Sequence, residues 1–367
     1  MLKTASWVHR HLVAVVDGSA THRAEVARAL FSFYAVTEYP SVGHAIAAFQ
    51  VAKPAVVLIG DRLGPQGIVD LANALGDTSA LKDIPVVMVI DRETDESLPD
   101  ALGAQAYLVR PYRRSTLIHV ISDILNRNIE TQWESLPETQ RSALKNTLSV
   151  FNSVSDVIDR GEPIAYKTIR EACSPLVDAI HRNEFRTILS GVREHDNYSY
   201  AHSLRVATLL SLFGHVIGLP QADQMTLATG GLLHDVGKLS IPYEVLNKPD
   251  RLSPSEWEVM KSHVEASLRY LNNTPDLPKG ILVIAGQHHE KLNGEGYPNG
   301  LTGDELNELA RMASIVDVFG ALTDRRSYKP PMPAEEALRI MTEQMTTHLD
   351  SRLLGLFREM LLDAVID

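Results

Sequence analysis

The sequence predicts two domains of different fold class, a doubly wound α/β domain over residues 1–126 and an all-α domain over 166–367, joined by a helical linker over 127–165. Three observations support this division. Short apolar runs alternate with amphipathic stretches in residues 1–126. One apolar stripe with helical spacing runs through residues 127–165. In residues 166–367, histidines and aspartates recur beside the apolar faces of helical segments.

Five short apolar runs predict the strands of the first domain: 12–17, 34–39, 55–60, 85–90 and 106–109. The stretches between them have helical spacing: 22–33, 42–50, 68–76 and 115–125. Continuous apolar strands that alternate with helices are typical of a parallel sheet covered on both faces. A sheet of this kind places its ligand site at the carboxyl ends of the strands.

The order of these elements and the residues at the strand ends resemble the receiver domain of two-component response regulators. In that family, acidic residues after the first strand bind Mg²⁺ and an aspartate after the third strand is phosphorylated. The matching residues here are Asp17 and Asp61, and Pro65 completes the family's Asp-x-x-x-Pro pattern. The resemblance implies a receiver-like fold for the first domain.

Three positions depart from the receiver pattern. Gly18 stands where a second carboxylate is usual, Ile90 stands at the hydroxyl position after the fourth strand, and Arg110 replaces the usual lysine. Two oxygen ligands in place of three bind Mg²⁺ poorly. We therefore expect a vestigial site, made up of Asp17, Asp61 and Arg110, that is not phosphorylated and whose two aspartates are solvated loop carboxylates. Such a domain acts in dimerisation or partner binding.

The linker is predicted to contain one amphipathic helix. Its apolar residues recur at steps of three and four: Leu144, Leu148, Phe151, Val154 and Ile158. Pro137 and Pro163 mark its limits. Two interpretations are open. The stripe packs against its own domain, or it forms a parallel dimer helix that carries a signal between the domains.

Composition excludes several classes of protein. The net charge of -11 argues against a partner that is a nucleic acid polymer, because phosphates are repelled. Cys173 is the single cysteine, which favours a reducing compartment and leaves no intrachain disulfide. We find neither a secretory signal nor an apolar run long enough for a membrane span. A cytoplasmic protein without membrane association is expected.

The predicted helices of the third segment hold a set of buried polar residues: His202, His234, Asp235, His263, His288, His289 and Asp317. Burying so many polar groups without a metal is costly. Adjacent residues on a helix point about 100° apart, so His288 and His289 suit two neighbouring ions rather than one. The carboxylate of Asp235 has two oxygens with which to bridge them. Mixed imidazole and carboxylate ligands favour iron, manganese or zinc over Mg²⁺.

Residues 195–329 resemble the HD-GYP domain, the branch of the HD phosphohydrolases that hydrolyses cyclic di-GMP. The segments that carry the resemblance are HDNYSYAHS, LLHDVGKLSIP, VLNKPDRLSPSEWEVMKSH, HHEKLNGEGYPNGL and IVDVFGALTDRRSYK. Three residues depart from the family pattern. Ser199 replaces a threonine, Asn293 replaces an aspartate, and Gly320 stands at the second aspartate of the closing segment.

The resemblance implies a role for each matching residue. The seven histidines and aspartates named above correspond to metal ligands, and Asp235 to the ligand shared by both ions. Tyr198 stands where some members have the glutamate ligand of a third metal, so two divalent ions are expected, Fe or Mn. Lys238 corresponds to a catalytic lysine near the scissile phosphate, and three residues to contacts of the dinucleotide: Tyr297, Arg326 and Lys329. We interpret His195 and Asp196 as a polar pair at the start of a helix.

The function predicted on this basis is hydrolysis of cyclic di-GMP to pGpG, GMP or both at a binuclear metal centre, regulated through the receiver-like domain. Expected partners are cyclic di-GMP, a second copy of the chain through the receiver and linker helix, and signalling proteins such as GGDEF proteins. Two alternatives are open. The first alternative is a metal-bound but weakly active signalling module, which is favoured by Asn293, Gly320 and the altered receiver. The second alternative is an HD hydrolase that acts on another nucleotide, and the GYP segment argues against it.

Overall fold

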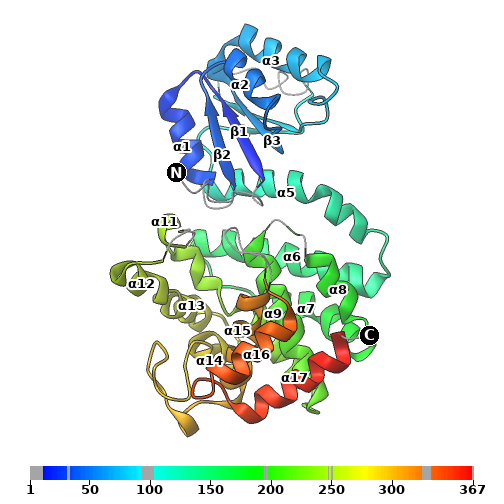
Figure 1. Cartoon of the computed structure of the whole chain (residues 1–367), viewed down its shortest axis with the longest axis vertical. Coiled ribbons are helices and arrows are strands. Elements are labelled where there is room, and N and C mark those ends of the chain that lie inside the picture. Colours follow the sequence, from blue (N-terminus) through cyan, green and yellow to red (C-terminus); the bar gives the residue numbers. More distant parts are fainter. Residues whose placement is uncertain are drawn as a thin grey trace. The chain divides into compact units, whose positions relative to one another are not determined.

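The computed structural model describes residues 11–30, 34–92, 103–193, 195, 197–246, 248, 251–324 and 332–365. The chain divides into two compact units, residues 1–128 and 129–367. Figure 1 shows a sheet with helices in the first unit and a bundle of helices in the second. The predicted order of an α/β domain followed by an all-α domain is confirmed.

The first unit contains one five-stranded parallel sheet with the order β2-β1-β3-β4-β5. Its strands are β1 (Leu12–Val16), β2 (Ala35–Tyr39), β3 (Val56–Gly60), β4 (Val86–Ile90) and β5 (Ala106–Val109). Each lies within one residue of its predicted bounds. This order is one of the two common doubly wound arrangements, and it is the order found in response-regulator receivers.

Alternate residues of the interior strand β1 enter two separate cores, one on each face of the sheet. Val13 and Val15 pack with α1 (Ala20–Leu30) and α5 (Arg114–Trp133). Ala14 and Val16 pack with two other helices, α2 (Val42–Phe49) and α3 (Pro65–Asp77). A short 3₁₀ turn, η1 (Asp61–Leu63), follows β3. The continuous apolar runs of the sequence are therefore explained, since both faces of every central strand are buried.

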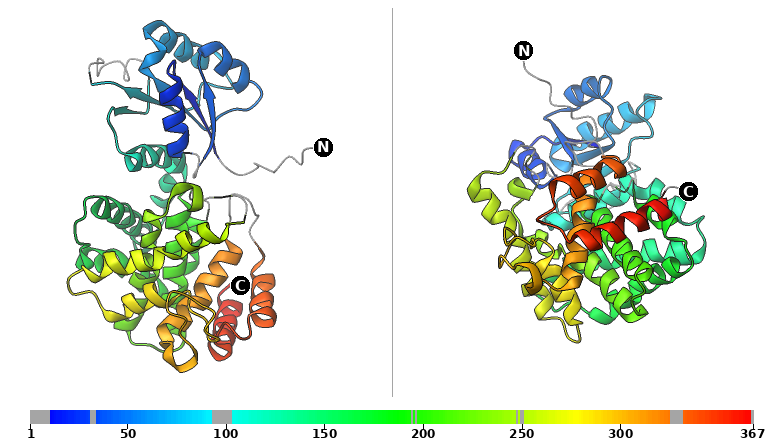
Figure 2. Two further views of the ribbon diagram at one scale, coloured as in Figure 1. Left: turned by 90° about the vertical axis from the view of Figure 1, so that its left-hand side faces the viewer. Right: turned by 60° about the horizontal axis from the view of Figure 1, so that its bottom comes forward.

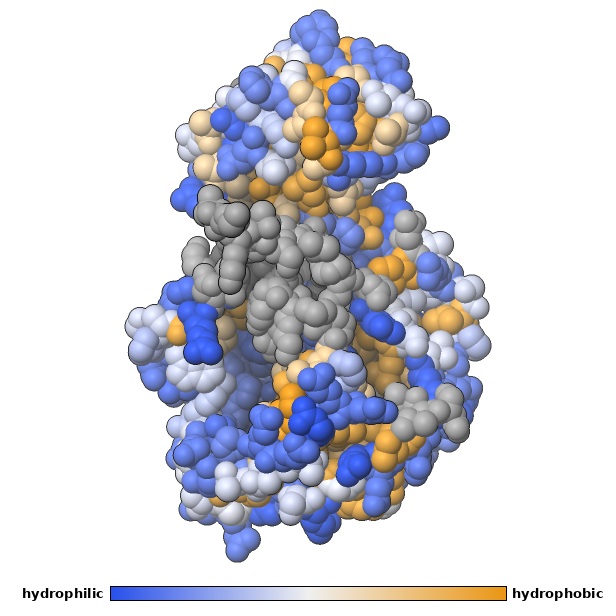
Figure 3. All heavy atoms as spheres, viewed as in Figure 1, coloured by the Kyte–Doolittle hydropathy of each residue, from blue (hydrophilic) through white to orange (hydrophobic). Residues whose placement is uncertain are grey.

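The second unit is built of helices packed against one another, as Figures 1 and 2 show. In chain order these are α6 (Glu138–Asp159), α7 (Tyr166–His181), α8 (Phe185–Val192), α9 (Tyr198–Val216), α10 (Gln221–Leu233), η2 (Val236–Ser240), α11 (Tyr243–Leu246), α12 (Pro254–Lys261), α13 (His263–Asn272), α14 (Lys279–Gln287), η3 (Gly303–Glu305), α15 (Glu308–Thr323), α16 (Ala334–Gln344) and α17 (Ser351–Val365). On the face seen in Figure 3, hydrophilic residues cover most of this unit and apolar ones form smaller patches.

The predicted linker helix is α6, and its apolar stripe is buried within the helical unit. Leu144 and Val154 belong to the same core as the later helices, and Leu148 and Phe151 pack against it. The end of α5 joins that core too, because Trp133 is 2% exposed and its indole N–H donates to the Gly191 carbonyl at 2.9 Å. Of the two interpretations of the stripe, packing against its own domain is the one that the structure displays.

Close packing of α9, α10 and α14 brings distant parts of the sequence together at the centre of this unit. A Cβ on Gly231 of α10 would lie 2.6 Å from the Ala207 Cα of α9. A Cβ on the adjacent Gly230 would lie 2.5 Å from Ile284 Cδ1 of α14. A side chain at position 231 would collide with backbone, and one at position 230 would displace the end of the Ile284 side chain, so the glycines let the three helices approach closely. Within the described residues, none of the helices has both the length and the apolar character that crossing a membrane requires.

We predict that Gly231→Ala destabilises the helical unit by about 1–3 kcal/mol, since the added methyl group meets the backbone of Ala207, which cannot rotate away. The measurement is thermal or urea unfolding of the full chain. Gly355→Ala is the matched control, because Gly355 of α17 has open space around it and alanine favours a helix. Equal stability of the two variants would show that the α9–α10 contact is not constrained in this way.

Candidate metal centre

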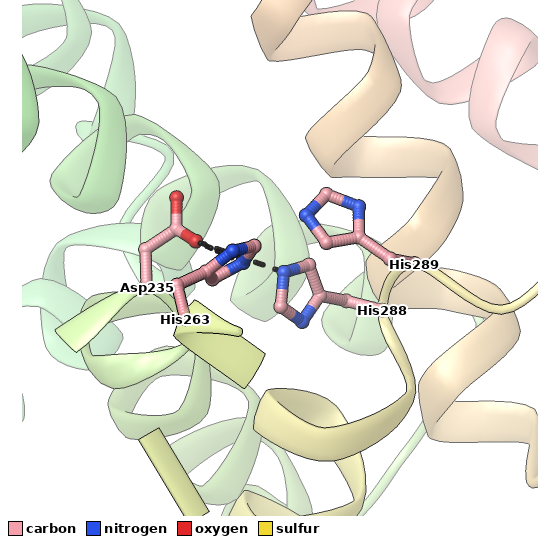
Figure 4. Close-up of side chains that lie close together, drawn as sticks. All are labelled: Asp235, His263, His288 and His289. Atoms are coloured by element: carbon pink, nitrogen blue, oxygen red, sulfur yellow. Dashed lines mark ion pairs between the residues drawn. The ribbon is translucent and has the colours of Figure 1, made fainter. Parts of the chain in front are cut away.

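Seven imidazole and carboxylate side chains meet where α9, α10, α13, α14 and α15 converge. Asp235, His263, His288 and His289 form one group, whose ligand atoms lie within 4.8 Å of one another. A second group, defined by the same limit, consists of His202, His234 and Asp317. Figure 4 shows Asp235, His263 and His288 facing one another, with the His289 ring beside His288. The structure thus brings together all seven residues that the sequence singled out as ligands.

Backbone carbonyls fix the orientation of three of these rings. Nδ1 of His234 lies 2.8 Å from the Gly231 carbonyl, Nδ1 of His263 lies 2.8 Å from the Met260 carbonyl, and Nδ1 of His288 lies 3.1 Å from the Ile284 carbonyl. A carbonyl only accepts hydrogen bonds, so Nδ1 carries the proton in each ring. Nε2 is then the atom directed into the site, and it binds a metal once it carries no proton.

Several atoms of the site are buried without a hydrogen-bond partner: Nε2 of His234, His263 and His288, and Oδ1 of Asp235. An unsatisfied buried polar atom costs about 1–3 kcal/mol. Imidazole lone pairs and carboxylate oxygens are all acceptors, so they cannot satisfy one another unless protons or a cation lie between them. The donor set therefore fits divalent metal ions that prefer mixed nitrogen and oxygen ligands.

Asp235 faces both groups of ligands. Its Oδ1 lies 3.2 Å from His263 Nε2 and 3.7 Å from His288 Nε2. Its Oδ2 lies 3.2 Å from His234 Nε2 and also contacts the ammonium group of Lys238. One oxygen is thus directed at each group, which is the geometry that a bridging ligand requires.

Asp317 of α15 also stands between the groups. Its Oδ1 lies 3.1 Å from His202 Nε2 and 3.7 Å from His234 Nε2, whereas its Oδ2 lies 3.8 Å from His289 Nδ1. The sequence did not distinguish Asp317 from the other ligands. Its second oxygen shows that two carboxylates, not one, connect the two halves of the site.

The pKa values in the site follow from burial and from neighbouring charges. Burial opposes ionisation of Asp235, but the charges of Lys238 and His234 hold the pKa of this carboxyl well below its ordinary value. Burial likewise opposes the charged form of His234, yet Asp235 and Asp317 raise its pKa to about 10. Burial, with the adjacent His288, holds the pKa of His289 well below its ordinary value. A metal ion would therefore meet ionised carboxylates and would displace a proton from His234.

Comparisons with known proteins bear on this geometry. The family described as HD domain matches residues 188–353. A 3'3'-cGAMP-specific phosphodiesterase of Vibrio cholerae is 37% identical over 153 residues, which are 42% of this chain and 33% of the relative. A cyclic di-GMP phosphodiesterase of Pseudomonas aeruginosa is 34% identical over 189 residues, which are 50% of this chain and 45% of the relative. The chain thus spans less than half the length of these two relatives.

Two further comparisons cover more of the chain. A cyclic di-GMP phosphodiesterase response regulator of Xanthomonas campestris is 28% identical over 302 residues, which are 81% of this chain and 73% of the relative. The solved structure of an HDGYP protein from Bdellovibrio bacteriovorus superposes with a TM-score of 0.51 at 21% identity, covering 69% of this chain and 88% of that one. The second comparison concerns the fold alone. Residues 188–353 of the helical unit thus match an HD domain, in agreement with the resemblance found in the sequence.

The loop that follows the ligands His288 and His289 is held by a residue that sequence analysis missed. Glu290 is 2% exposed, and its two carboxylate oxygens accept the backbone N–H groups of Asn299 at 2.7 Å and Leu301 at 3.0 Å. The signal was present in the sequence, because Glu290 is the third residue of the His-His-Glu motif. Its role is to fix the GYP loop beside the metal centre.

Tyr297, at the centre of this loop, lies against the site. Its ring centroid is 4.7 Å from that of His289, and the edge of Trp257 on α12 approaches it at 5.9 Å. Lys261 places its ammonium nitrogen 6.0 Å from the same ring. Trp257 is 44% exposed, so this aromatic and basic cluster beside His289 reaches the protein surface.

The remaining site residues are placed as follows. Asn293 accepts the backbone N–H of Glu295 at 3.2 Å, a local turn contact. His195 lies just before α9 and accepts the backbone N–H of Asn197, the N-cap of that helix. Asp196, Arg326 and Lys329 lie outside the described residues, as does the side chain of Tyr198.

The vestigial receiver site differs from our expectation in one respect. The prediction that Asp17 and Asp61 are solvated loop carboxylates is wrong, because their side chains are 0% and 12% exposed. Arg110 forms an ion pair with Asp61 and a second one with Asp91, at 2.6 Å. Asp17 accepts a hydrogen bond from His22 at 2.6 Å. The sequence could not reveal these pairs, since the partners approach only when the sheet forms.

Arg110 therefore supplies inside the protein the positive charge that Mg²⁺ supplies in a phosphorylated receiver. A Cβ on Gly18 would collide with the carbonyl oxygen of Arg62, so a second carboxylate does not fit there either. The carboxylate of Asp17 occupies the space beside Gly60. The acidic pocket is filled by its own residues.

We predict that acetyl phosphate with Mg²⁺ leaves the mass of the full chain unchanged, because Asp61 is already paired with Arg110 and the Mg²⁺ site lacks its second carboxylate. Intact-mass spectrometry is the measurement, with a phosphorylatable receiver as the positive control. A phosphoryl adduct located on Asp61 would contradict this expectation.

Proposed function

We propose that this protein hydrolyses cyclic di-GMP to pGpG, GMP or both at a binuclear metal centre in its HD-GYP domain, under the control of its receiver-like unit. The observation that supports the proposal most directly is the set of buried, unpartnered ligand atoms around Asp235. The relatives reported above bear the names of cyclic dinucleotide phosphodiesterases, which agrees with this chemistry.

Two divalent ions, Fe or Mn, are proposed for the site. Asp235, His263, His288 and His289 would hold one ion, and the second group of ligands would hold the other, with Asp235 shared between them. When bound, such a pair of ions ionises water near neutral pH and neutralises charge on a phosphoryl group.

The chain's own residues would bind and orient the substrate. The Lys238 side chain is 30% exposed and is tethered by its contact with Asp235, so its ammonium group can reach a non-bridging phosphate oxygen and stabilise the charge that develops there. Tyr297 presents a ring at the mouth of the site, suited to contact with a guanine base. Arg326 and Lys329 are proposed as further contacts of the dinucleotide, because a chain of charge -11 needs local cations to bind an anion.

The partner predictions stay proposals. GGDEF proteins and a second copy of the chain are the expected partners of the receiver-like unit. The stripe of α6 is packed inside the helical unit, so a dimer of this kind would depend on the receiver surface more than on α6.

The test is product analysis with Fe- and Mn-loaded full chain, given cyclic di-GMP, 3'3'-cGAMP and a non-cyclic nucleotide in parallel. We expect cyclic di-GMP to be cut to pGpG or GMP. The similarity to a 3'3'-cGAMP-specific relative makes 3'3'-cGAMP the main alternative substrate. Preference for 3'3'-cGAMP would overturn the proposed substrate, whereas metal-dependent binding of cyclic di-GMP without turnover would favour the signalling module.

We predict that wild-type protein purified without oxygen holds about two ions per chain, and that Asp235→Ala loses metal and nearly all hydrolysis, because the shared carboxylate is removed. The measurements are metal analysis and turnover. Circular dichroism should stay near wild type, since one pocket in a large helical core is changed. If the variant kept both ions and wild-type turnover, Asp235 would not be the bridging ligand.

Tyr297→Ala is predicted to keep the metals and to raise KM more than it lowers kcat, because only a substrate contact outside the ligand set is lost. Steady-state kinetics with cyclic di-GMP, together with metal analysis, check this. Loss of metal in this variant would show that Tyr297 shapes the ligand geometry through its contact with His289.

A further inference from the structure

Asp324 contacts His202 from the end of α15. Its Oδ2 lies 2.7 Å from His202 Nδ1, so the ring N–H donates to the carboxylate. Its Oδ1 accepts a hydrogen bond from Arg205 at 2.6 Å. The Asp324 side chain is 9% exposed. His202 is therefore oriented by a buried carboxylate at Nδ1 while its Nε2 faces Asp317 in the metal centre.

This arrangement differs from that of the neighbouring ligands. His234, His263 and His288 each direct Nδ1 at a backbone carbonyl three or four residues earlier in the chain. The carboxylate that contacts His202 comes from 122 residues away. A carboxylate behind a ligating imidazole fixes the ring and makes Nε2 a stronger ligand than a neutral carbonyl does.

Gly320, four residues before Asp324, lies beside the same ring. A Cβ at position 320 would be 3.3 Å from His202 Cε1, 3.5 Å from His202 Nδ1 and 3.7 Å from Asp324 Oδ2. Position 320 is the one at which the HD-GYP pattern has an aspartate. A side chain there and the carboxylate of Asp324 would therefore compete for one place next to the imidazole.

We infer that Asp324 is the positioning residue of His202 and replaces the carboxylate that is missing at Gly320. The two positions are one helical turn apart, so they lie on the same side of α15. Asp324 is the C-cap of that helix and has an extended backbone, and its N–H donates to the Gly320 carbonyl at 2.7 Å. Arg205, one turn after His202 on α9, holds the second oxygen and fixes the carboxylate. The glycine at 320 leaves room for this contact.

The inference rests on the proposed metal centre, in which His202 is a ligand. It also changes the interpretation of Gly320, because the lack of an aspartate at this position would by itself indicate weaker metal binding. A carboxylate still contacts His202, and it comes from position 324 instead of position 320.

Four proteins test the inference: wild type, Asp324→Ala, Gly320→Asp and the double variant. Asp324→Ala should bind Mn²⁺ about 10–100-fold more weakly, the usual cost of losing such a partner. Gly320→Asp should also bind more weakly, because two carboxylates then crowd one ring N–H. The double variant should recover most of the affinity, since one carboxylate again faces His202 and the ring has space to adjust.

The measurements are calorimetric titration with Mn²⁺, the visible absorption of bound Co²⁺, and thermal unfolding of the metal-free chains. Asp304→Ala is the matched control, because it removes the same charge from a fully exposed carboxylate. A merely structural role for Asp324 would lower stability without recovery of metal affinity in the double variant. That result, or wild-type affinity in Asp324→Ala, overturns the inference.

Failure of the proposed function gives a different result. A wild-type chain that binds metal but cuts no cyclic dinucleotide leaves the positioning role intact, provided that the double variant recovers affinity. A wild-type chain that binds neither Mn²⁺ nor Co²⁺ overturns both proposals.

Discussion

The burial of two carboxylates among imidazoles is the constraint on which the helical unit depends. Asp235 and Asp317 are 9% and 7% exposed, and the groups closest to them are mainly imidazole nitrogens. A buried charge that loses its partner costs about 3–5 kcal/mol, so this core is stable only when protons or cations balance the charge. The close packing of α9, α10 and α14 at Gly230 and Gly231 meets the same constraint, because the ligands come from helices far apart in the chain and must meet at one point.

Two clusters of acidic side chains among the described residues are satisfied in opposite ways. In the receiver-like unit, Arg110 pairs with Asp61 and Asp91, and His22 pairs with Asp17, so the pocket is balanced by its own side chains. In the helical unit, backbone carbonyls hold the Nδ1 atoms of His234, His263 and His288, and the Nε2 atoms of these three rings have no hydrogen-bond partner. The first arrangement resists an external ion, and the second requires one. Acidic residues alone do not define a metal site, because both clusters hold a cation beside a carboxylate, Arg110 in one and Lys238 in the other. The imidazole nitrogens without a hydrogen-bond partner distinguish the second cluster.

Sequence analysis predicted the strands to within one residue, because each is a continuous apolar run that a sheet buried on both faces requires. It also identified the seven residues that meet in the site, because polar groups beside apolar helical faces need partners and because the resemblance to the HD-GYP domain implies this ligand set. It failed for Asp17 and Asp61, whose partners His22 and Arg110 are recognisable only after folding. Glu290 was overlooked although it belongs to the His-His-Glu motif, because the backbone N–H groups that donate to it come from a loop nine and eleven residues later in the chain.

Asn293 and Gly320 show why departures from a motif have to be judged in space. Both replace an aspartate in the family pattern, and on the sequence alone they suggest equal loss. Asn293 lies in an exposed turn, where its side chain accepts the Glu295 N–H and also hydrogen-bonds to the Glu295 carboxylate, so these contacts are local to the turn. Gly320 lies against a ligand, where a lost carboxylate affects the imidazole directly. Only at the second position does a neighbouring residue restore the interaction, because only there does burial make an unpaired imidazole N–H costly.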